Sequence, residues 1–204
     1  TTLYKNEYVI MGTLLDVIGS VVIGGALLMM LFTFTAQLQE TSQRSLYTAT
    51  MVDHMDQAAI KINNLFSLAG IGLSADSTCI VADSNKVTFR TYWDYNNNVL
   101  TDSPHSIQLK LDTVTHPILG TAIIITQDGT QLTDLGYILY IEYLKFIYYN
   151  KWDQVTTNPS AVRSVDVLLT FRRDAPSLVN RPLRTNIQLR CFFMNSYLRM
   201  GHSV

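Results

Sequence analysis

The stretch IMGTLLDVIGSVVIGGALLMMLFTFTAQ, residues 10–37, is apolar along its length except for one charged side chain, the carboxylate of Asp16. No charged residue occurs from position 17 to position 39. A helix of that length measures about 35 Å, which is enough to cross the roughly 30 Å hydrocarbon core of a bilayer. The stretch therefore predicts a helix that enters a membrane, with an acid placed near one end.

The flanks of this stretch favour one orientation. Lys5 lies on its N-terminal side, and Glu40 and Arg44 lie on the other. By the positive-inside rule, this favours a cytoplasmic N-terminus with the bulk of the chain outside. A signal peptide is the alternative, but its apolar region is usually shorter. With 15% charged residues and a net charge of -1, the composition favours neither disorder nor nucleic acid as a partner.

Beyond the stretch, apolar residues recur mostly at steps of three and four, which predicts an amphipathic helix. The residues of this stripe are Leu46, Met51, Met55, Ala58, Ala59, Ile62, Leu65 and Phe66. No proline precedes Pro104 and no glycine lies between Gly25 and Gly70, so we expect one helix over about residues 8–68. AGIG at 69–72 is expected to end it.

After position 72 the apolar period becomes two, which predicts strands. The predicted strands are CIVAD (79–83), NKVTFRTYW (85–93), HSIQLKLD (105–112), GTAIIITQD (120–128), GYILYIEYLKFIYYN (136–150), VRSVDVLLTFRR (162–173) and TNIQLRCFFM (185–194). Turn residues separate them, so we expect one antiparallel sheet packed on the striped helix.

The predicted fold is therefore α+β: a long N-terminal helix whose apolar half protrudes and whose other half lies on a C-terminal antiparallel β-sheet domain. We divide the chain into a leader-like segment at 1–7, an apolar membrane or filament-core helix at 8–39, its amphipathic continuation at 40–72 and the β domain at 73–204. A helix that is apolar on all sides has to lie in lipid or against copies of itself.

GTLLD at 12–16 resembles, in register, the FTLIE motif of the type IV pilin-like proteins, which include pilins and the pseudopilins of secretion systems. Gly12 takes the first position, Thr13 the threonine and Asp16 the acid. INNLFSLAGIGLSAD (62–76) and IVADSNKVTFRTYWDYNNN (80–98) are similar to the segment after the helix in minor pilins and pseudopilins. YIEYLKFIYYN (140–150), VRSVDVLLTFRR and RTNIQLR (184–190) resemble their closing strands.

The resemblance implies a subunit that is first held in the inner membrane and is then transferred to a surface filament or periplasmic pseudopilus, with other copies or related subunits as partners. Met11 stands where the family has Gly before the cleavage point, so we expect an atypical class III leader, and the sequence leaves open whether it is removed. The motif's glutamate is replaced by Asp16, one methylene shorter.

In this family the acid is thought to pair with a neighbour's terminal amine, which sets the axial register of the helices. Here we expect Asp16 to pair with Lys5, with a neighbour's N-terminus, or with Thr13 one turn away. Gly19, Ser20, Gly24 and Gly25 add small residues, and Ser20 and Gly24 have the small-xxx-small spacing of close helix pairs. The alternative is that Asp16 marks the interface end of an ordinary membrane anchor.

Two further sets of residues have other possible chemistry. Cys79 and Cys191 are the two cysteines, and they form either a disulfide or two buried thiols. The side chains of Asp94, Asn96 and Asn98 follow the D-x-N-x-N start of a calcium loop, but Val99 replaces the glycine, so an Asn-rich hairpin turn is the alternative.

No nucleotide or nucleophile motif is present in the sequence. We therefore expect a non-enzymatic filament subunit without a cofactor. The competing hypothesis is a single-pass anchored extracytoplasmic β domain that acts as a receptor or adhesin without polymerising. The sequence leaves open whether the subunit would be a major or a minor one.

Overall fold

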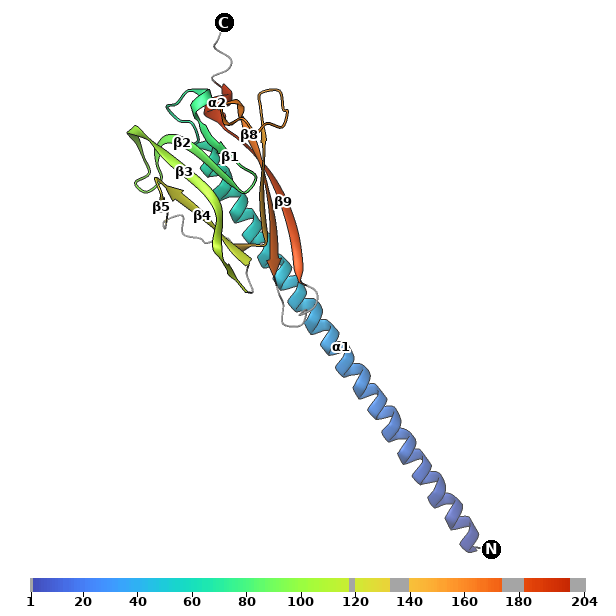
Figure 1. The fold of residues 1–204 in the computed structure, drawn as a ribbon. Coiled ribbons are helices and arrows are strands. Elements are labelled where there is room, and N and C mark those ends of the chain that lie inside the picture. The colour runs from blue at the N-terminus through green and yellow to red at the C-terminus, as the bar shows by residue number, and fades with distance from the viewer. Residues whose placement is uncertain (1, 118–119, 133–139, 174–181, 199–204) are drawn as a thin grey trace. The chain divides into compact units, whose positions relative to one another are not determined.

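The apolar stretch and the striped segment form one helix, α1 (Thr2–Ser67), in the computed structural model (Figure 1). The structure describes residues 2–117, 120–132, 140–173 and 182–198, with side chains from position 14 onward. The predicted helix is confirmed, although it begins earlier than expected, at Thr2. It runs without a break through the expected boundaries at 7/8 and 39/40.

The chain divides into two compact units, Thr1–Leu46 and Tyr47–Val204. The first unit holds the N-terminal part of α1, and the second holds the rest of α1 and all the described strands. This division marks where packing on the helix begins, whereas the boundary expected at 39/40 marks where the apolar run ends. Leu46 is 66% exposed, so the stripe of buried residues starts at Met51 and its predicted first member was wrong.

The helix ends where the sequence predicted. Gly70 and Gly72 have φ angles of 75° and 77°, in the left-handed region where glycine is favoured. A Cβ atom added to Gly70 would lie 2.5 Å from Oγ1 of Thr78, so this position has no room for a side chain. The two glycines turn the chain away from the helix axis and toward the first strand.

Carbonyl groups at the end of α1 and in the turn that follows it accept hydrogen bonds from side chains of the β domain. Tyr95 donates its hydroxyl to the carbonyl oxygen of Leu65 at 2.7 Å, and Thr91 donates to that of Leu68 at 2.7 Å. The amide of Asn195 donates to two further carbonyls at 3.3 and 3.0 Å. The helix end is therefore fixed by side chains from distant parts of the sequence.

The strands form two antiparallel sheets. The six-stranded sheet holds β1 (Cys79–Ala82), β2 (Lys86–Asp94), β3 (Val99–His116), β4 (Gly120–Gln127), β5 (Thr130–Gln131) and β6 (Tyr140–Ile141). The three-stranded sheet holds β7 (Tyr143–Tyr149), β8 (Ser164–Arg173) and β9 (Leu183–Phe192). The short helices are η1 (Ala75–Ser77), η2 (Pro159–Ala161) and α2 (Met194–Leu198).

The predicted α+β fold is confirmed, but the strands form two antiparallel sheets and not one, because the described part of the predicted strand at 136–150 changes sheet at Glu142. Its part before this residue, β6, pairs with β4, and its part after it, β7, pairs with β8. The backbone N–H of Glu142 donates to the carbonyl oxygen of Thr170 at 2.7 Å, which fixes the crossing point. Each of the other predicted strands contains an observed strand or most of one, except the one at 105–112, which covers only the middle of β3 because that strand runs from Val99 to His116.

One core joins the buried stripe of α1 to both sheets. Phe66 of α1 lies 5.5 Å from Phe89 of β2 and 5.6 Å from Phe193, which follows β9, between ring centroids. All three rings are 0% exposed. The same core includes Ile62 of α1 and Val167 of β8. The aromatic triangle therefore connects the helix, the first sheet and the C-terminal segment.

Replacing Phe66 by Ala should lower the free energy of unfolding of the β domain by about 3–5 kcal/mol, because it leaves a cavity among these rings. The matched control is Phe32→Ala, since Phe32 is 68% exposed on the same helix, and it should change this free energy by less than about 0.5 kcal/mol. Denaturant titration of the detergent-solubilised chain, followed by near-ultraviolet circular dichroism, measures both. An equal decrease in the free energy of unfolding for Phe66→Ala and Phe32→Ala would contradict the assignment of the core.

Candidate assembly surface on the N-terminal helix

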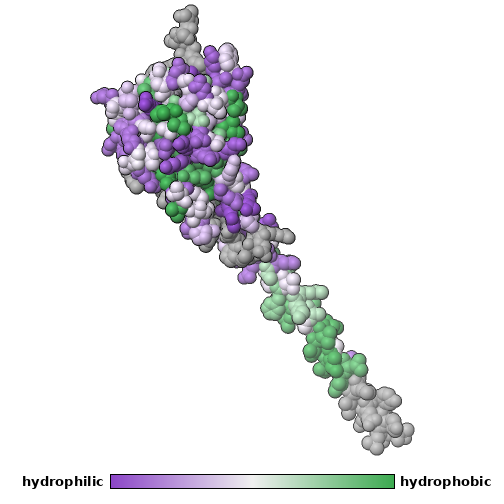
Figure 2. Space-filling model, in the orientation of Figure 1, coloured by the Kyte–Doolittle hydropathy of each residue, from purple (hydrophilic) through white to green (hydrophobic). Residues whose placement is uncertain are grey.

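The N-terminal part of α1 is apolar and uncovered. From position 14 to position 46 every side chain is exposed except at Gly19 and Gly24, which are half-buried. Leu15 is 70% exposed and Phe32 68%. None of the most apolar window of this helix is buried by the chain itself, and Figure 2 shows apolar residues along its described length. The helix is therefore a candidate membrane anchor by length and composition.

Asp16 lies on a face of small residues. Positions three and four residues away are its neighbours on a helix surface. Here these positions hold Gly12, Thr13, Gly19 and Ser20. Among the described residues, the positions one turn after Asp16 hold only the small residues Gly19 and Ser20, so a second helix can approach the carboxylate closely there. The sequence analysis named these residues singly and missed their common arrangement, although their spacing is visible in the sequence.

The hydroxyl groups of this segment bond to their own helix. Ser20 donates to a backbone carbonyl three residues earlier at 2.8 Å. Thr33 donates to one four residues earlier at 2.8 Å, and Thr35 donates within its own turn at 2.9 Å. These side chains can enter an apolar environment without leaving a donor unpaired. Asp16 is then the one charged side chain at positions 14–39 that needs an external partner or a proton.

The other glycines of the segment lie at different positions around the helix. A Cβ atom added at Gly19, Gly24 or Gly25 would meet nothing within 4 Å. At about 100° per residue, Gly19 lies on the side of Asp16, whereas Gly25 lies on the opposite side. The expected partners Lys5 and Thr13 belong to the helical backbone, but their side chains lie outside the described residues, so the pairing of Asp16 stays a prediction.

The interpretation of residues 95–98 as an Asn-rich hairpin turn is confirmed. They join β2 to β3, and Asn98 has a φ angle of 52°. One carboxylate oxygen of Asp94 accepts hydrogen bonds from the backbone N–H of Asn96 at 2.9 Å and from the amide of Gln127 at 2.8 Å. The other accepts from the amide of Asn97 at 2.7 Å. The carboxylate proposed as a calcium ligand therefore binds the turn itself.

Across the described parts of the chain, no three His, Cys, Asp or Glu side chains are grouped as a metal site. The hydrogen bonds from Gln127 and Asn97 lower the pKa of Asp94 to about 2, while its burial opposes them. Asp94 is therefore ionised at neutral pH in the folded hairpin, and its charge stabilises the turn.

The cysteines are both free and buried in the structure. Cys79 lies on β1 and Cys191 on β9, both within the common core. Burial raises the pKa of each thiol to about 12, so both are protonated at neutral pH and are poor nucleophiles. Of the two alternatives left open by the sequence, the structure contains the pair of buried thiols and not the disulfide.

No protein-family model, curated protein or solved structure matches this chain. The argument about function therefore depends on the geometry of α1. That geometry brings Asp16 together with Gly19 and Ser20 on one side of the helix and leaves Gly25 on the other.

Replacing Asp94 by Asn should destabilise the β domain at pH 7. The folded-state pKa of Asp94, about 2, is below its ordinary value of 3.8, so its charge stabilises the folded state above pH 3.8. That contribution is lost as the pH falls toward 2. The free energies of unfolding of the wild type and of Asp94→Asn should therefore become equal there. Denaturation at several pH values measures this, with Asp102→Asn on the same hairpin as the control. A difference that stays constant down to pH 2 would contradict the account.

Proposed function

We propose that this chain is a non-enzymatic structural subunit of a type IV pilin-like filament and assembles through α1. The observation that supports this most is the uncovered apolar helix with its acid on a small-residue face. A simple anchor needs an apolar surface but has no use for a carboxylate surrounded by small residues. A bundle of like helices uses both features.

The cost of the acid explains why it favours assembly. A carboxylate within the hydrocarbon region of a bilayer carries an insertion cost, which is largest at the centre and smaller toward the ends of a helix. A positively charged group of a neighbouring chain removes that cost by pairing with Asp16, and the small residues around it let the two backbones approach. Because only one axial offset brings the two charges together, the pair also sets the register between helices.

Transfer from lipid to a helix bundle costs little in hydrophobic terms, because the helix exchanges one apolar surrounding for another. The chain is therefore held first in the inner membrane and then in a polymer of like or related subunits. The β domain, whose core is complete without the N-terminal part of α1, covers the outside of the filament. The proposal needs no cofactor and no nucleic acid.

The alternative is a membrane-anchored receptor or adhesin that stays monomeric. It shares the exposed apolar helix, but it gives no role to the small residues at positions 12, 13, 19 and 20. Detergent extraction separates the two. In detergent, an anchored monomer should dissolve as one small species. A filament subunit should instead be sheared from cells as long fibres.

Asp16→Ala should reduce the number of filaments per cell at least tenfold, because the inserted helix loses its register-setting charge. Electron microscopy of the cell surface counts the filaments, and immunoblotting of membranes shows that the subunit is still present. Leu15→Ala is the control, since Leu15 is its apolar neighbour and is 70% exposed. Unchanged filament numbers with Asp16→Ala would refute the register role.

Gly19→Leu should also reduce assembly at least tenfold, because the new side chain stands between Asp16 and an approaching helix. Gly25→Leu is the matched control, since an added Cβ meets nothing within 4 Å at either position and Gly25 faces away from Asp16. It should assemble to within twofold of wild type by the same count. Equal losses for the two variants would show that the face around Asp16 has no special part in assembly.

A further inference from the structure

The outer face of the six-stranded sheet carries basic side chains. In β2, Val87 and Phe89 are buried in the core. Side chains alternate along a strand, so Lys86 and Arg90 lie on the opposite, outer face. The register of β2 with β3 places Lys86 directly opposite Lys110, so Lys110 shares this face. We call Lys86, Arg90 and Lys110 the basic face.

The opposition of Lys86 and Lys110 is unfavourable for the fold. The Cβ atoms of directly opposed residues lie about 4.5–5.5 Å apart, and like charges at that distance destabilise a sheet. Within the described chain, no cation of the basic face forms an ion pair. Arg90 and Lys110 are exposed and Lys86 is half-buried. The fold therefore keeps two repelling lysines without a counter-ion, which favours a role other than stability.

Two acids border the basic face, and both are bound to their own surroundings. Asp128 follows β4 and pairs with Nδ1 of His105 at 2.7 Å, and it accepts the backbone N–H of Ser106 at 2.8 Å. Asp112, two residues after Lys110, accepts the backbone N–H of Thr113 at 2.6 Å. The basic face therefore lacks an acid that could neutralise it among these neighbours.

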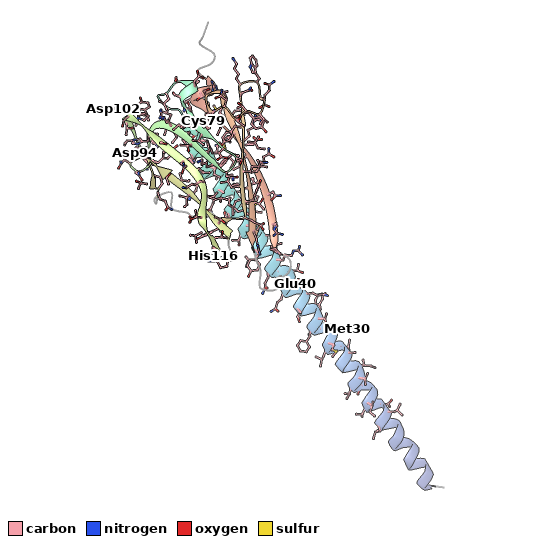
Figure 3. The ribbon with its side chains drawn as sticks, viewed as in Figure 1. Met30, Glu40, Cys79, Asp94, Asp102 and His116 are labelled. Atoms are coloured by element: carbon pink, nitrogen blue, oxygen red, sulfur yellow. The ribbon has the colours of Figure 1, made fainter. Side chains whose placement is uncertain are left out.

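The basic face lies along the strands and not at the hairpin end. Figure 3 shows Asp94 and Asp102 at one end of the β2–β3 hairpin and His116 at the other. Lys86 and Arg90 are four residues apart on β2, which separates their Cα atoms by about 13 Å at about 3.3 Å per residue. A polymer with anionic groups along its length can contact both ends of this face at once, whereas an inorganic anion binds at one end.

The residues between the cations are polar and carry no aromatic ring. Thr88 lies opposite Gln108, whose amide donates to the Thr88 hydroxyl at 3.3 Å, and Gln108 lies opposite Thr126 of β4. Amide and hydroxyl groups can exchange hydrogen bonds with the hydroxyl groups of sugars. Single-stranded nucleic acids, in contrast, bind largely through bases stacked on aromatic rings. These rows therefore fit a charged polysaccharide better than a nucleic acid.

We propose that the basic face binds an anionic polysaccharide, whose carboxylate or sulfate groups pair with Lys86, Lys110 and Arg90. The guanidinium of Arg90 can bind a carboxylate with two parallel hydrogen bonds, and the lysines supply point charges. This inference goes beyond the proposed filament and does not rest on it, because a single chain carries the whole face. In a filament the face would repeat from subunit to subunit, which would strengthen the binding of a long polymer.

Lys110→Glu in the full chain, purified in a non-ionic detergent, tests this proposal. The variant should bind immobilised heparin or alginate at least tenfold more weakly than the wild type in surface plasmon resonance, because a carboxylate replaces a cation of the face. It should unfold at the same temperature or a higher one, since a glutamate opposite Lys86 removes the repulsion. Lys151→Glu is the matched control, because it changes the charge equally on the exposed turn after β7 and should bind within twofold of the wild type.

Single-stranded DNA and uncharged dextran complete the experiment. Dextran should not bind, and heparin or alginate should bind more tightly than DNA at the same salt concentration; the tighter polysaccharide identifies the anionic group. The proposal is overturned if neither polysaccharide binds, if Lys110→Glu binds as tightly as Lys151→Glu, or if DNA binds more tightly. A lower unfolding temperature for Lys110→Glu would also overturn it, by showing that Lys110 serves the fold. None of these results depends on filament formation, which the filament counts measure separately.

Discussion

A helix that is apolar on every side cannot remain in water, and this constraint decides how the first unit of the chain is used. The residues of the most apolar window of α1 are not buried by the rest of the described chain. The surrounding that covers them must therefore be lipid or other helices. In the filament that we propose, Asp16 favours the second surrounding, because a charged partner on another helix would remove the cost that lipid imposes on a carboxylate.

The second unit, in contrast, packs around the C-terminal end of the same helix and fixes it. The stripe that begins at Met51 is buried against two sheets, and Phe66 contacts both the first sheet and the C-terminal segment. Tyr95 and Asn195 donate hydrogen bonds to carbonyl groups in the last turn of the helix. The end of the helix is thereby held by residues from several distant parts of the sequence.

Much of this fold was predictable from the sequence, because it depends on local patterns. The switch from a period of three to four to a period of two located the strands, and Gly70 and Gly72 located the helix end. The separate sheets were not predictable, because the change at Glu142 depends on a hydrogen bond to Thr170, far along the chain. The same holds for the role of Asn195. The face around Asp16 was readable from helical spacing alone.

Cryo-electron microscopy of fibres sheared from cells that express the chain tests the central claim most directly. The account predicts that the apolar helices lie side by side along the fibre axis, with each acid at position 16 within hydrogen-bond reach of a polar or charged group of a neighbouring chain. Particles that contain one chain, with its apolar helix surrounded only by lipid or detergent, would contradict it.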